Sequence, residues 1–383
     1  MQAKRLAWAL FILVAAGFAE TIEIPAKRHG AGPLFRIERG GKWGFMDRRG
    51  KTVISPQFDY ARDYFGGLAG VFIKDKWGYI DERGNVKIKP QYDEIQDFLG
   101  ALAPVLLGKR WGYIDKTGKV VVPFDHQEAY EFHDGLARVG DWTRTACTDR
   151  IYGLEEAPAK AFKLDWGFSD TGRPCLGVDT RYEFVDESGK RKFSGLGTRV
   201  WDFSESLAMF EVGEYPDTKI GFIDTAGAIV IPAIFFSASD FHEGLAPANV
   251  GGRIVGNRVE GNQRGYIDRT GRFVIAAEYD YAGDFSEGLA RVMTVGVDGA
   301  NMRYIDKAGK TVISGPFNEA WDFHDGRAAV FDRSGWHLID KTGARVLPAV
   351  RQFTVFSDGL AIIGKTSNRI YIDTTGREIA RYD

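Results

Sequence analysis

The sequence is poor in the residues that usually mark an active site or a nucleic-acid surface. Among 383 residues it has two cysteines and six histidines, and its formal net charge is −2. No Gly-x-Ser-x-Gly, P-loop, His-Glu-x-x-His or dinucleotide-binding pattern occurs. The near-neutral charge argues against a nucleic-acid partner, and no His or Cys has metal-ligand spacing to another. We therefore expect no cofactor, no metal site and no nucleic-acid binding.

Long hydrophobic runs are also lacking once the N-terminus is passed. There, Lys4 and Arg5 precede an apolar run from Leu6 to Phe18 that ends in small residues. This pattern predicts a signal peptide over residues 1–19, a lead-in over 20–33 and an extracytoplasmic location, periplasmic or secreted. The run is short for a bilayer, so an uncleaved anchor is the alternative, and no membrane span is expected after cleavage.

The chain instead contains a repeated sequence motif, Lys-Trp-Gly-Tyr-Ile-Asp-x-x-Gly. Nine copies recur about every 34 residues, which predicts a repeat array rather than a compact enzyme domain. The later copies match the motif less closely and centre on Asp186, Asp224, Asp268, Asp306, Asp340 and Asp373. In the first three copies the structural positions of the repeat are Trp43, Gly44, Asp47, Gly50, Trp77, Gly78, Asp81, Gly84, Trp111, Gly112, Asp115 and Gly118.

Each copy predicts three β-strands. The Trp-Gly segment alternates like a strand, and Asp47 to Gly50 fits a type I turn that leads into a hairpin. The returning strand, Thr52 to Ile54, is β-branched, and Pro56 is expected to end it because proline cannot donate to a ladder. A Leu-Ala-x-Val segment, such as Leu136 to Val139, supplies the third strand. Each unit is therefore predicted to be a three-stranded meander.

The number of units bears on the overall fold, which is predicted to be all-β. Residues 34–383 hold nine whole meanders, with no strand left over at either end. Because a closed propeller often shares one blade between its termini, this favours an open β-solenoid or superhelix, with a closed β-propeller-like ring as the alternative. The glycine beside each Trp, such as Gly44, is expected to allow close approach of a neighbouring unit.

The repeat motif and its Leu-Ala extension resemble the WG (KWG) β-repeat family of bacterial proteins, from about Pro33 to the C-terminus. Several later copies lose the Trp, since Tyr182, Ile220, Gly265 and Tyr371 lie in or beside its position, and Trp336-His337 keeps the Trp but loses the Gly. The resemblance implies an extracytoplasmic or scaffold-like repeat protein. It supplies no catalytic residues.

Acidic residues recur at two repeat positions. The Asp of the Asp-x-x-Gly turn supplies one carboxylate per unit, too few for calcium, so a turn-stabilising role is favoured over a cation ladder. The second position, which we call the acidic row, either attracts a basic partner or accepts local backbone N–H groups, and the local role is favoured. The acidic row consists of Asp63, Asp97, Glu131, Asp202, Asp240, Asp284 and Asp322.

Cys147 and Cys175 are the only cysteines, and both lie in the longest interruption of the array, residues 140–181. In an exported protein an even pair favours a structural disulfide. A catalytic thiol is the alternative, but it lacks a nearby His or a Cys-x-x-Cys spacing.

Four interruptions fall in one equivalent connection, between a Leu-Ala strand and the next Trp-Gly strand, and should therefore emerge on one face. They are Gly140–Arg181, Gly213–Thr218, Gly251–Gln263 and Val295–Asn301. Such loops either build a binding surface or reflect neutral drift. The leading hypothesis is a non-enzymatic, exported scaffold that binds a protein or cell-envelope partner. A carbohydrate-binding module using aromatic rings is the runner-up, and an enzyme within residues 140–181 is a third.

Overall fold

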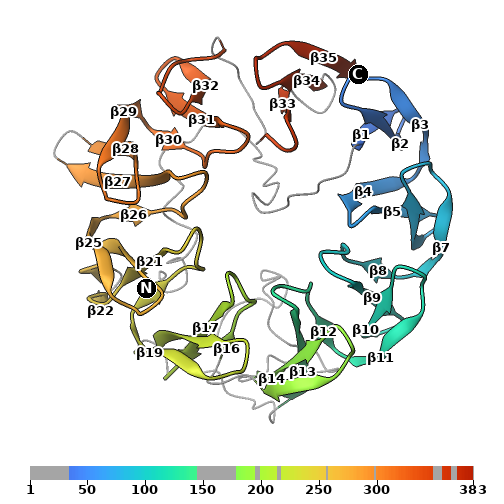
Figure 1. The fold of residues 1–383 in the computed structure, drawn as a ribbon, viewed down its shortest axis with the longest axis horizontal. Coiled ribbons are helices and arrows are strands. Elements are labelled where there is room, and N and C mark those ends of the chain that lie inside the picture. The colour runs from blue at the N-terminus through green and yellow to red at the C-terminus, as the bar shows by residue number, and fades with distance from the viewer. Residues whose placement is uncertain are drawn as a thin grey trace, which may run out of the picture.

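The computed structural model describes residues 34–144, 178–194, 199–213, 217–255, 258–296, 299–347, 356–363 and 369–382. Within these residues the regular structure consists of nine small antiparallel sheets and one two-stranded hairpin. No helix that could cross a membrane occurs in these parts of the chain. The nine sheets follow one another in chain order around a ring (Figure 1). We call them blades 1 to 9.

The first three blades contain the near-consensus repeats. Blade 1 comprises β1 (Leu34–Arg39), β2 (Lys42–Asp47) and β3 (Thr52–Phe58). Blade 2 comprises β4 (Tyr60–Phe65), β5 (Leu68–Ile73), β6 (Lys76–Asp81) and β7 (Val86–Tyr92). Blade 3 comprises β8 (Glu94–Ile95), β9 (Leu102–Leu107), β10 (Arg110–Asp115) and β11 (Val120–His126).

The middle blades carry the longer connections. Blade 4 comprises β12 (Glu128–Ala129), β13 (Leu136–Arg144), β14 (Val178–Asp186) and β15 (Arg191–Ser194). Blade 5 comprises β16 (Arg199–Val200), β17 (Leu207–Val212), β18 (Lys219–Asp224) and β19 (Ile229–Phe235). Blade 6 comprises β20 (Ser237–Ala238), β21 (Ala246–Asn249), β24 (Arg264–Ile267) and β25 (Phe273–Tyr279), with β22 (Arg253–Val255) and β23 (Arg258–Glu260) as a separate hairpin.

The last three blades return to the first. Blade 7 comprises β26 (Tyr281–Ala282), β27 (Ala290–Gly296), β28 (Gly299–Ile305) and β29 (Thr311–Phe317). Blade 8 comprises β30 (Glu319–Ala320), β31 (Arg327–Asp332) and β32 (Gly335–Asp340). Blade 9 comprises β33 (Leu360–Ile363), β34 (Arg369–Asp373) and β35 (Glu378–Tyr382).

The prediction of three strands per unit missed the innermost strand. In the described residues, six blades have four strands and three have three. The extra strand precedes the Leu-Ala strand and pairs with it, as β8 pairs with β9 through Glu94↔Leu106 and Ile95↔Val105. Most of these inner strands are two residues long, and so short a run has no alternation that a sequence pattern could reveal.

Proline does not end the returning strand, contrary to the prediction. β3 continues through Pro56 to Phe58, on the outer edge of its blade. Its register with β2 shifts between Trp43 and Phe45, where the strand bulges. Proline is tolerated there because an outer-edge strand at a bulge has N–H groups that need no ladder partner.

The same bulge explains the glycine beside each Trp. A Cβ added to Gly44 would lie 2.4 Å from the carbonyl oxygen of Ile54 and 2.6 Å from the nitrogen of Pro56. Gly78 and Gly112 meet the carbonyls of Ile88 and Val122 in the same way, at 2.5 and 2.7 Å. The glycine therefore admits the returning strand of its own blade, not a neighbouring unit as predicted.

The array is a closed ring, so the leading expectation of an open solenoid is wrong and the alternative holds. Blades 1 and 9 pack together through Ile37, Met46, Leu360 and Tyr371. Arg369 adds an ion pair at 3.6 Å to Glu38. No described sheet takes strands from both ends of the chain. The ring closes by side-chain packing between two whole blades, a form that the count of strands did not exclude.

Candidate functional site

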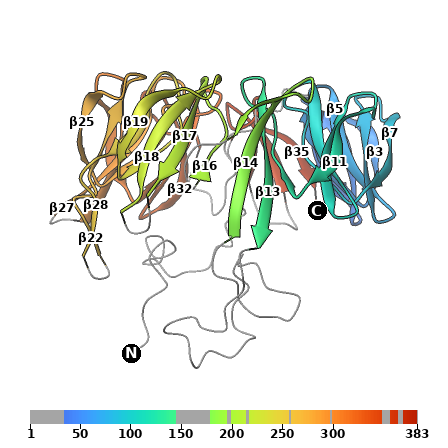
Figure 2. The same cartoon turned by 90° about the horizontal axis from the view of Figure 1, so that it is seen from below.

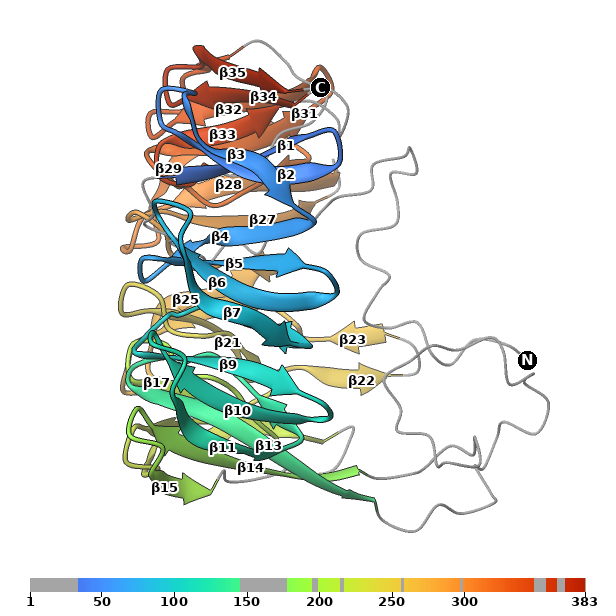
Figure 3. The same cartoon turned by 90° about the vertical axis from the view of Figure 1, so that its right-hand side faces the viewer.

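The extended connections project from one face of the ring, which we call the insertion face. β13 and β14 stay paired out to Arg144↔Val178, and their ends extend beyond the other blades (Figure 2). The β22–β23 hairpin projects on the same side (Figure 3). β27 and β28, lengthened to Gly296↔Gly299, join at the equivalent strand end. This agrees with the expectation that the insertions share a face.

A buried asparagine fixes the base of the β22–β23 insertion. Asn249 is fully buried, and its amide donates to the carbonyl oxygens of Gly261 and Gln263 at 3.1 and 2.8 Å. Its own oxygen accepts the N–H groups of Gly251 and Gly252 at 2.8 and 3.0 Å. The hairpin therefore leaves the ring from a rigid, hydrogen-bonded base.

The opposite face holds the Asp-x-x-Gly turns, and we call it the turn face. Asp47 accepts the N–H groups of Arg49 and Lys51 at 2.9 and 3.0 Å. Asp115 does the same for its turn, and hydrogen bonds led by the hydroxyl of Thr117 lower the pKa of the Asp115 carboxyl. Asp81 repeats the arrangement. Gly50, Gly84 and Gly118 close these turns with positive φ, at 81°, 83° and 87°.

Other acidic side chains on the turn face join one blade to the next. Glu205 accepts the N–H of Gly244 at 2.8 Å, and Glu287 accepts that of Gly326 at 3.0 Å. Burial alone would raise the pKa of Glu243, but its bonds to Lys307 and Gly288 bring it below its ordinary value. These carboxylates are used within the ring.

Apart from Asp63, which lies within β4, the members of the acidic row lie just after the inner strands, and much of the row is paired with arginine. Four members meet an arginine of the preceding blade: Arg36–Asp63 at 2.6 Å, Arg62–Asp97 at 2.7 Å, Arg138–Asp202 at 3.0 Å and Arg291–Asp322 at 2.9 Å. These pairs cross the interfaces between blades. Their first role is therefore to hold adjacent blades together, which neither of the two sequence interpretations foresaw.

The arginine comes from either of two neighbouring positions. Arg291 stands on the Leu-Ala strand and lies over Gly283, whose added Cβ would be 2.9 Å from it. In blade 2 the two residues are exchanged: Arg62 stands on the inner strand and lies 3.1 Å from an added Cβ on Gly70. Burial opposes the charge of Arg62, but the bond to Asp97 raises its pKa above the ordinary value. Arg62 is thus held as a cation.

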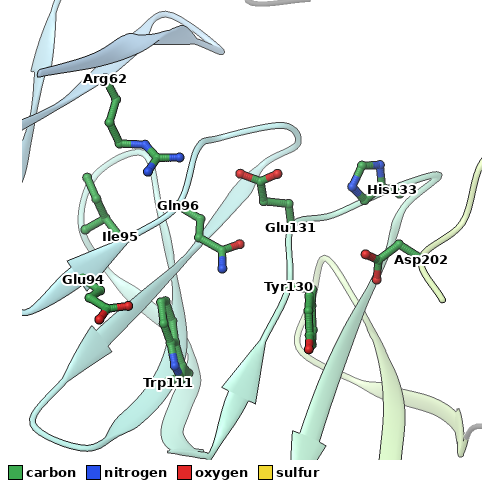
Figure 4. A pocket seen from close by; sticks show the side chains of 9 residues that line it. All are labelled: Arg62, Glu94, Ile95, Gln96, Trp111, Tyr130, Glu131, His133 and Asp202. Carbon is green, nitrogen blue, oxygen red and sulfur yellow. The ribbon is translucent and has the colours of Figure 1, made fainter. Parts of the chain in front are cut away.

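A cavity of about 440 Å³ lies among the inner parts of blades 2 to 5 (Figure 4). It brings together residues from all four blades: Arg62, Glu94, Ile95, Gln96, Trp111, Tyr130, Glu131, His133 and Asp202. Trp111 is a predicted repeat position, and Glu131 and Asp202 belong to the acidic row. The others occupy variable positions of the repeat, so no consensus could mark them.

Three carboxylates and one arginine give this cavity an acidic character. Arg62 is already bound to Asp97, with two hydrogen bonds at 2.7 and 2.9 Å. Glu131 accepts the N–H of Asp97 at 3.1 Å. Arg138, which holds Asp202, lies 3.8 Å from the centre of the Tyr130 ring. The described residues contain no group of three or more His, Cys, Asp or Glu side chains that could hold a metal ion.

The three predicted Trp side chains are half-buried, neither core nor open platform. The ring of Trp43 lies 5.1 Å from Tyr60, and that of Trp77 lies 5.9 Å from Tyr60 and 5.2 Å from Phe72. Trp111 packs one side against the core between blades 3 and 4 and lines the cavity with the other. Cys147 and Cys175 lie outside the described residues.

A profile of the WG-containing repeat matches six segments that together make up about half of the chain: residues 43–77, 77–111, 111–140, 220–253, 265–294 and 302–336. The chain belongs to the WG repeat family. No curated protein matches the chain.

Comparison with solved structures finds likenesses at low sequence identity. The WG repeat chain is similar to a eukaryotic initiation factor, with a TM-score of 0.58, 10% identity, and coverage of 91% of this chain and 94% of that chain. For dihydro-heme d1 dehydrogenase NirN the TM-score is 0.42 and the identity 12%, with coverage of 91% of this chain and 73% of that chain. For BamB from Moraxella catarrhalis the TM-score is 0.34 and the identity 11%, with coverage of 90% of this chain and 92% of that chain. The first of these likenesses supports a nine-bladed propeller fold and nothing further.

Proposed function

We propose that this WG repeat protein is an exported, non-enzymatic scaffold that binds a protein or cell-envelope partner through its insertion face. The observation that carries the proposal is the projection of β13–β14 and β22–β23 from one side of a closed ring (Figures 2 and 3). Loops that stand on a rigid scaffold can contact a partner without disturbing the core.

The use of polar groups elsewhere supports this choice of face. On the turn face, Asp47 and its equivalents accept N–H groups of their own turns, while Glu205 and Glu287 bind the next blade. Their hydrogen-bonding capacity serves the fold. The export part of the proposal depends on the N-terminal pattern of Lys4, Arg5 and the apolar run that follows.

A carbohydrate module receives less support. The rings of Trp43 and Trp77 are covered by other aromatic rings at 5.1 to 5.9 Å, so they offer no continuous platform for sugar faces. Of the three, Trp111 lines the cavity among blades 2 to 5.

The test removes the insertions while sparing their anchors. Joining Gly252 directly to Gly261 deletes β22 and β23 and keeps the residues that hydrogen-bond to Asn249. The two ends are close together, because an added Cβ on Gly261 would lie only 2.6 Å from the Gly251 oxygen. In the same variant, Asp141 and Arg181, which are paired, are joined by an Asn-Gly turn. Thermal unfolding should change little, because long surface loops contribute little to closure entropy.

Partner capture is then compared by quantitative mass spectrometry of envelope extract. We expect the partner retained by the wild type to be lost from the trimmed variant. A control variant with Arg49→Ala and Arg83→Ala, both exposed on the turn face, should retain it. If the trimmed variant captures as well as the wild type, or the control fails instead, the insertion face is not the binding surface.

A further inference from the structure

Trp111 differs from the equivalent tryptophans in what surrounds its ring. Trp43 lies beneath the guanidinium groups of Arg36 and Arg369, at 5.4 and 5.7 Å from its ring centre. Trp77 and Trp336 each contact two aromatic rings. Among the described residues, Trp111 has neither a cation nor an aromatic ring against its face. One repeat tryptophan is thus left open to the cavity.

Strand register shows which substitutions open it. Phe45, two residues after Trp43, pairs with Arg36, whereas the equivalent Tyr113 pairs with Pro104. Blade 3 therefore has proline where blade 1 has the arginine that covers its tryptophan. Trp111 therefore lacks the cation that covers the ring of Trp43.

The aromatic neighbour is also replaced. On the inner strand of blade 2, Tyr60 pairs with Phe72 and contacts Trp77. The equivalent position of blade 3 is Glu94, which pairs with Leu106. Glu94 is exposed, and it lines the cavity beside Trp111 (Figure 4). A carboxylate thus stands next to an uncovered indole face.

We propose that this cavity binds a guanidinium group, supplied by an arginine side chain of a partner peptide. The face of Trp111 would take the position relative to the cation that Trp43 has to Arg36, and Glu94 would supply the counter-charge. Trp is the best aromatic acceptor for a cation, and arginine stacks on it while binding a carboxylate in a planar, bidentate manner. The cavity already includes such a contact, Arg138 stacked 3.8 Å from the centre of the Tyr130 ring. The acidic balance of the lining favours a cationic guest over an anionic one.

This inference goes beyond the proposed function, because no residue of the cavity lies in an insertion. The two ideas can therefore fail separately. The loop-trimmed variant should keep the cavity response even if it loses its partner.

The test uses protein labelled with 5-fluorotryptophan and observed by fluorine NMR, with the resonance of Trp111 assigned from a Trp111→Phe variant. The probe is the peptide acetyl-Gly-Arg-Gly-amide, and the matched control contains citrulline, which is neutral but nearly identical in shape. We expect the arginine peptide to shift the Trp111 resonance and the citrulline peptide to leave it in place. Trp77, assigned in the same way, should not respond.

A second experiment tests the contribution of the Glu94 charge to peptide binding. Glu94→Gln should weaken the binding of the arginine peptide by about threefold, as expected for the loss of a solvent-exposed ion pair. Glu82→Gln, which removes an exposed carboxylate on the turn face, should leave the affinity unchanged. The proposal is overturned if the citrulline peptide shifts Trp111 equally, or if the arginine peptide causes no shift up to its solubility limit. A response to neutral oligosaccharides in place of the arginine peptide would also overturn it and would assign the cavity to sugars.

Discussion

The hydroxyl of Tyr371 in blade 9 donates to the carbonyl oxygen of Arg36 in blade 1, across 335 residues of sequence. Equivalent tyrosines make the same kind of bond between consecutive blades: Tyr79 to Gln96 at 2.7 Å, and Tyr304 to Trp321 at 2.7 Å. The same tyrosine position therefore joins the two ends of the chain, although its acceptor there stands on β1, whereas Gln96 and Trp321 directly follow an inner strand.

Removing this hydroxyl tests the closure. Tyr371→Phe should lower the free energy of unfolding by about 1 kcal/mol, the usual net contribution of one hydrogen bond. Tyr304→Phe, its match inside the array, should cost a similar amount. Urea unfolding measures both, and hydrogen exchange should rise in β1 and β34 for the first variant only. A stability of Tyr371→Phe equal to wild type, beside a clear loss for Tyr304→Phe, would mean that the ends do not close.

The sequence predicted the local structure of the repeat unit better than the arrangement of the units in a ring. The Asp-x-x-Gly turns and the shared face of the insertions depend on local contacts, such as those of Asp47 with Arg49 and Lys51. Closure depends on Tyr371 and Arg369, which stand in one of the most altered copies of the repeat and act on residues far away in sequence. A local pattern cannot report the small rotation between blades that decides between a ring and a solenoid.

The candidate site was only partly predictable for a similar reason. Trp111 is conspicuous as a repeat position, but its meaning lies in its neighbours. Pro104 and Glu94 count as unremarkable variable positions until the register of β8, β9 and β10 places them around one indole ring. The inner strand that carries Glu94 is two residues long, and a run of that length gives no periodic signal.

The tryptophans should differ in their contribution to stability. Trp77 is half-buried and packs against Tyr60 and Phe72, so Trp77→Ala should cost about 2 kcal/mol, less than for a fully buried Trp. Trp111→Ala should cost clearly less, since Trp111 contacts no aromatic ring among the described residues. Chemical denaturation of both variants measures the difference. Equal losses would show that ring contacts do not set the contribution of these side chains.

The exchange of arginine and glycine between two positions can be reversed by design. Arg62→Gly removes the arginine from Asp97, whose side chain is 3% exposed, and should cost about 3 kcal/mol. Adding Gly70→Arg together with Ile95→Ala recreates the arrangement of Arg291 and Gly283, because an added Cβ on Gly70 would otherwise meet Ile95 at 2.5 Å.

We expect the triple variant to recover at least half of the stability lost by its control, Arg62→Gly with Ile95→Ala. Both are compared by urea unfolding. If Gly70→Arg brings no gain over that control, the two positions are not interchangeable and the repeated pairing is coincidental.

Asp332 should contribute to the acid limb of stability. The hydroxyl and N–H of Ser334 and the ring of His337 hold the pKa of this carboxyl at about 2. Because the folded pKa lies below the unfolded value of about 3.9, this contribution is present above pH 4 and is lost as the pH falls towards 2. Asp332→Asn should therefore flatten the dependence of unfolding free energy on pH between about 4 and 2. Glu82→Gln serves as the exposed control, and an unchanged slope for Asp332→Asn would contradict the assignment.

The register of β13 and β14 sharpens the disulfide prediction. The described strands pair without a shift from Leu136↔Asp186 to Arg144↔Val178. Cys147 and Cys175 lie outside the described residues, and each is three positions in sequence from the last described pair. Directly opposite residues of antiparallel strands have Cα atoms about 4.5–5.5 Å apart, within the range that a disulfide spans.

We therefore expect protein recovered from the periplasm or the culture medium to contain a Cys147–Cys175 bond. Intact mass without reductant should be lower by two hydrogens than after reduction, and the Cys147→Ser, Cys175→Ser variant should show no such difference. Closing this loop would constrain the unfolded chain by about 3–4 kcal/mol on the chain-entropy account. We expect reduction to loosen the nearby ends of β13 and β14, seen as faster hydrogen exchange in these two strands, while the other blades stay protected. Two free thiols in the exported protein would contradict the pairing.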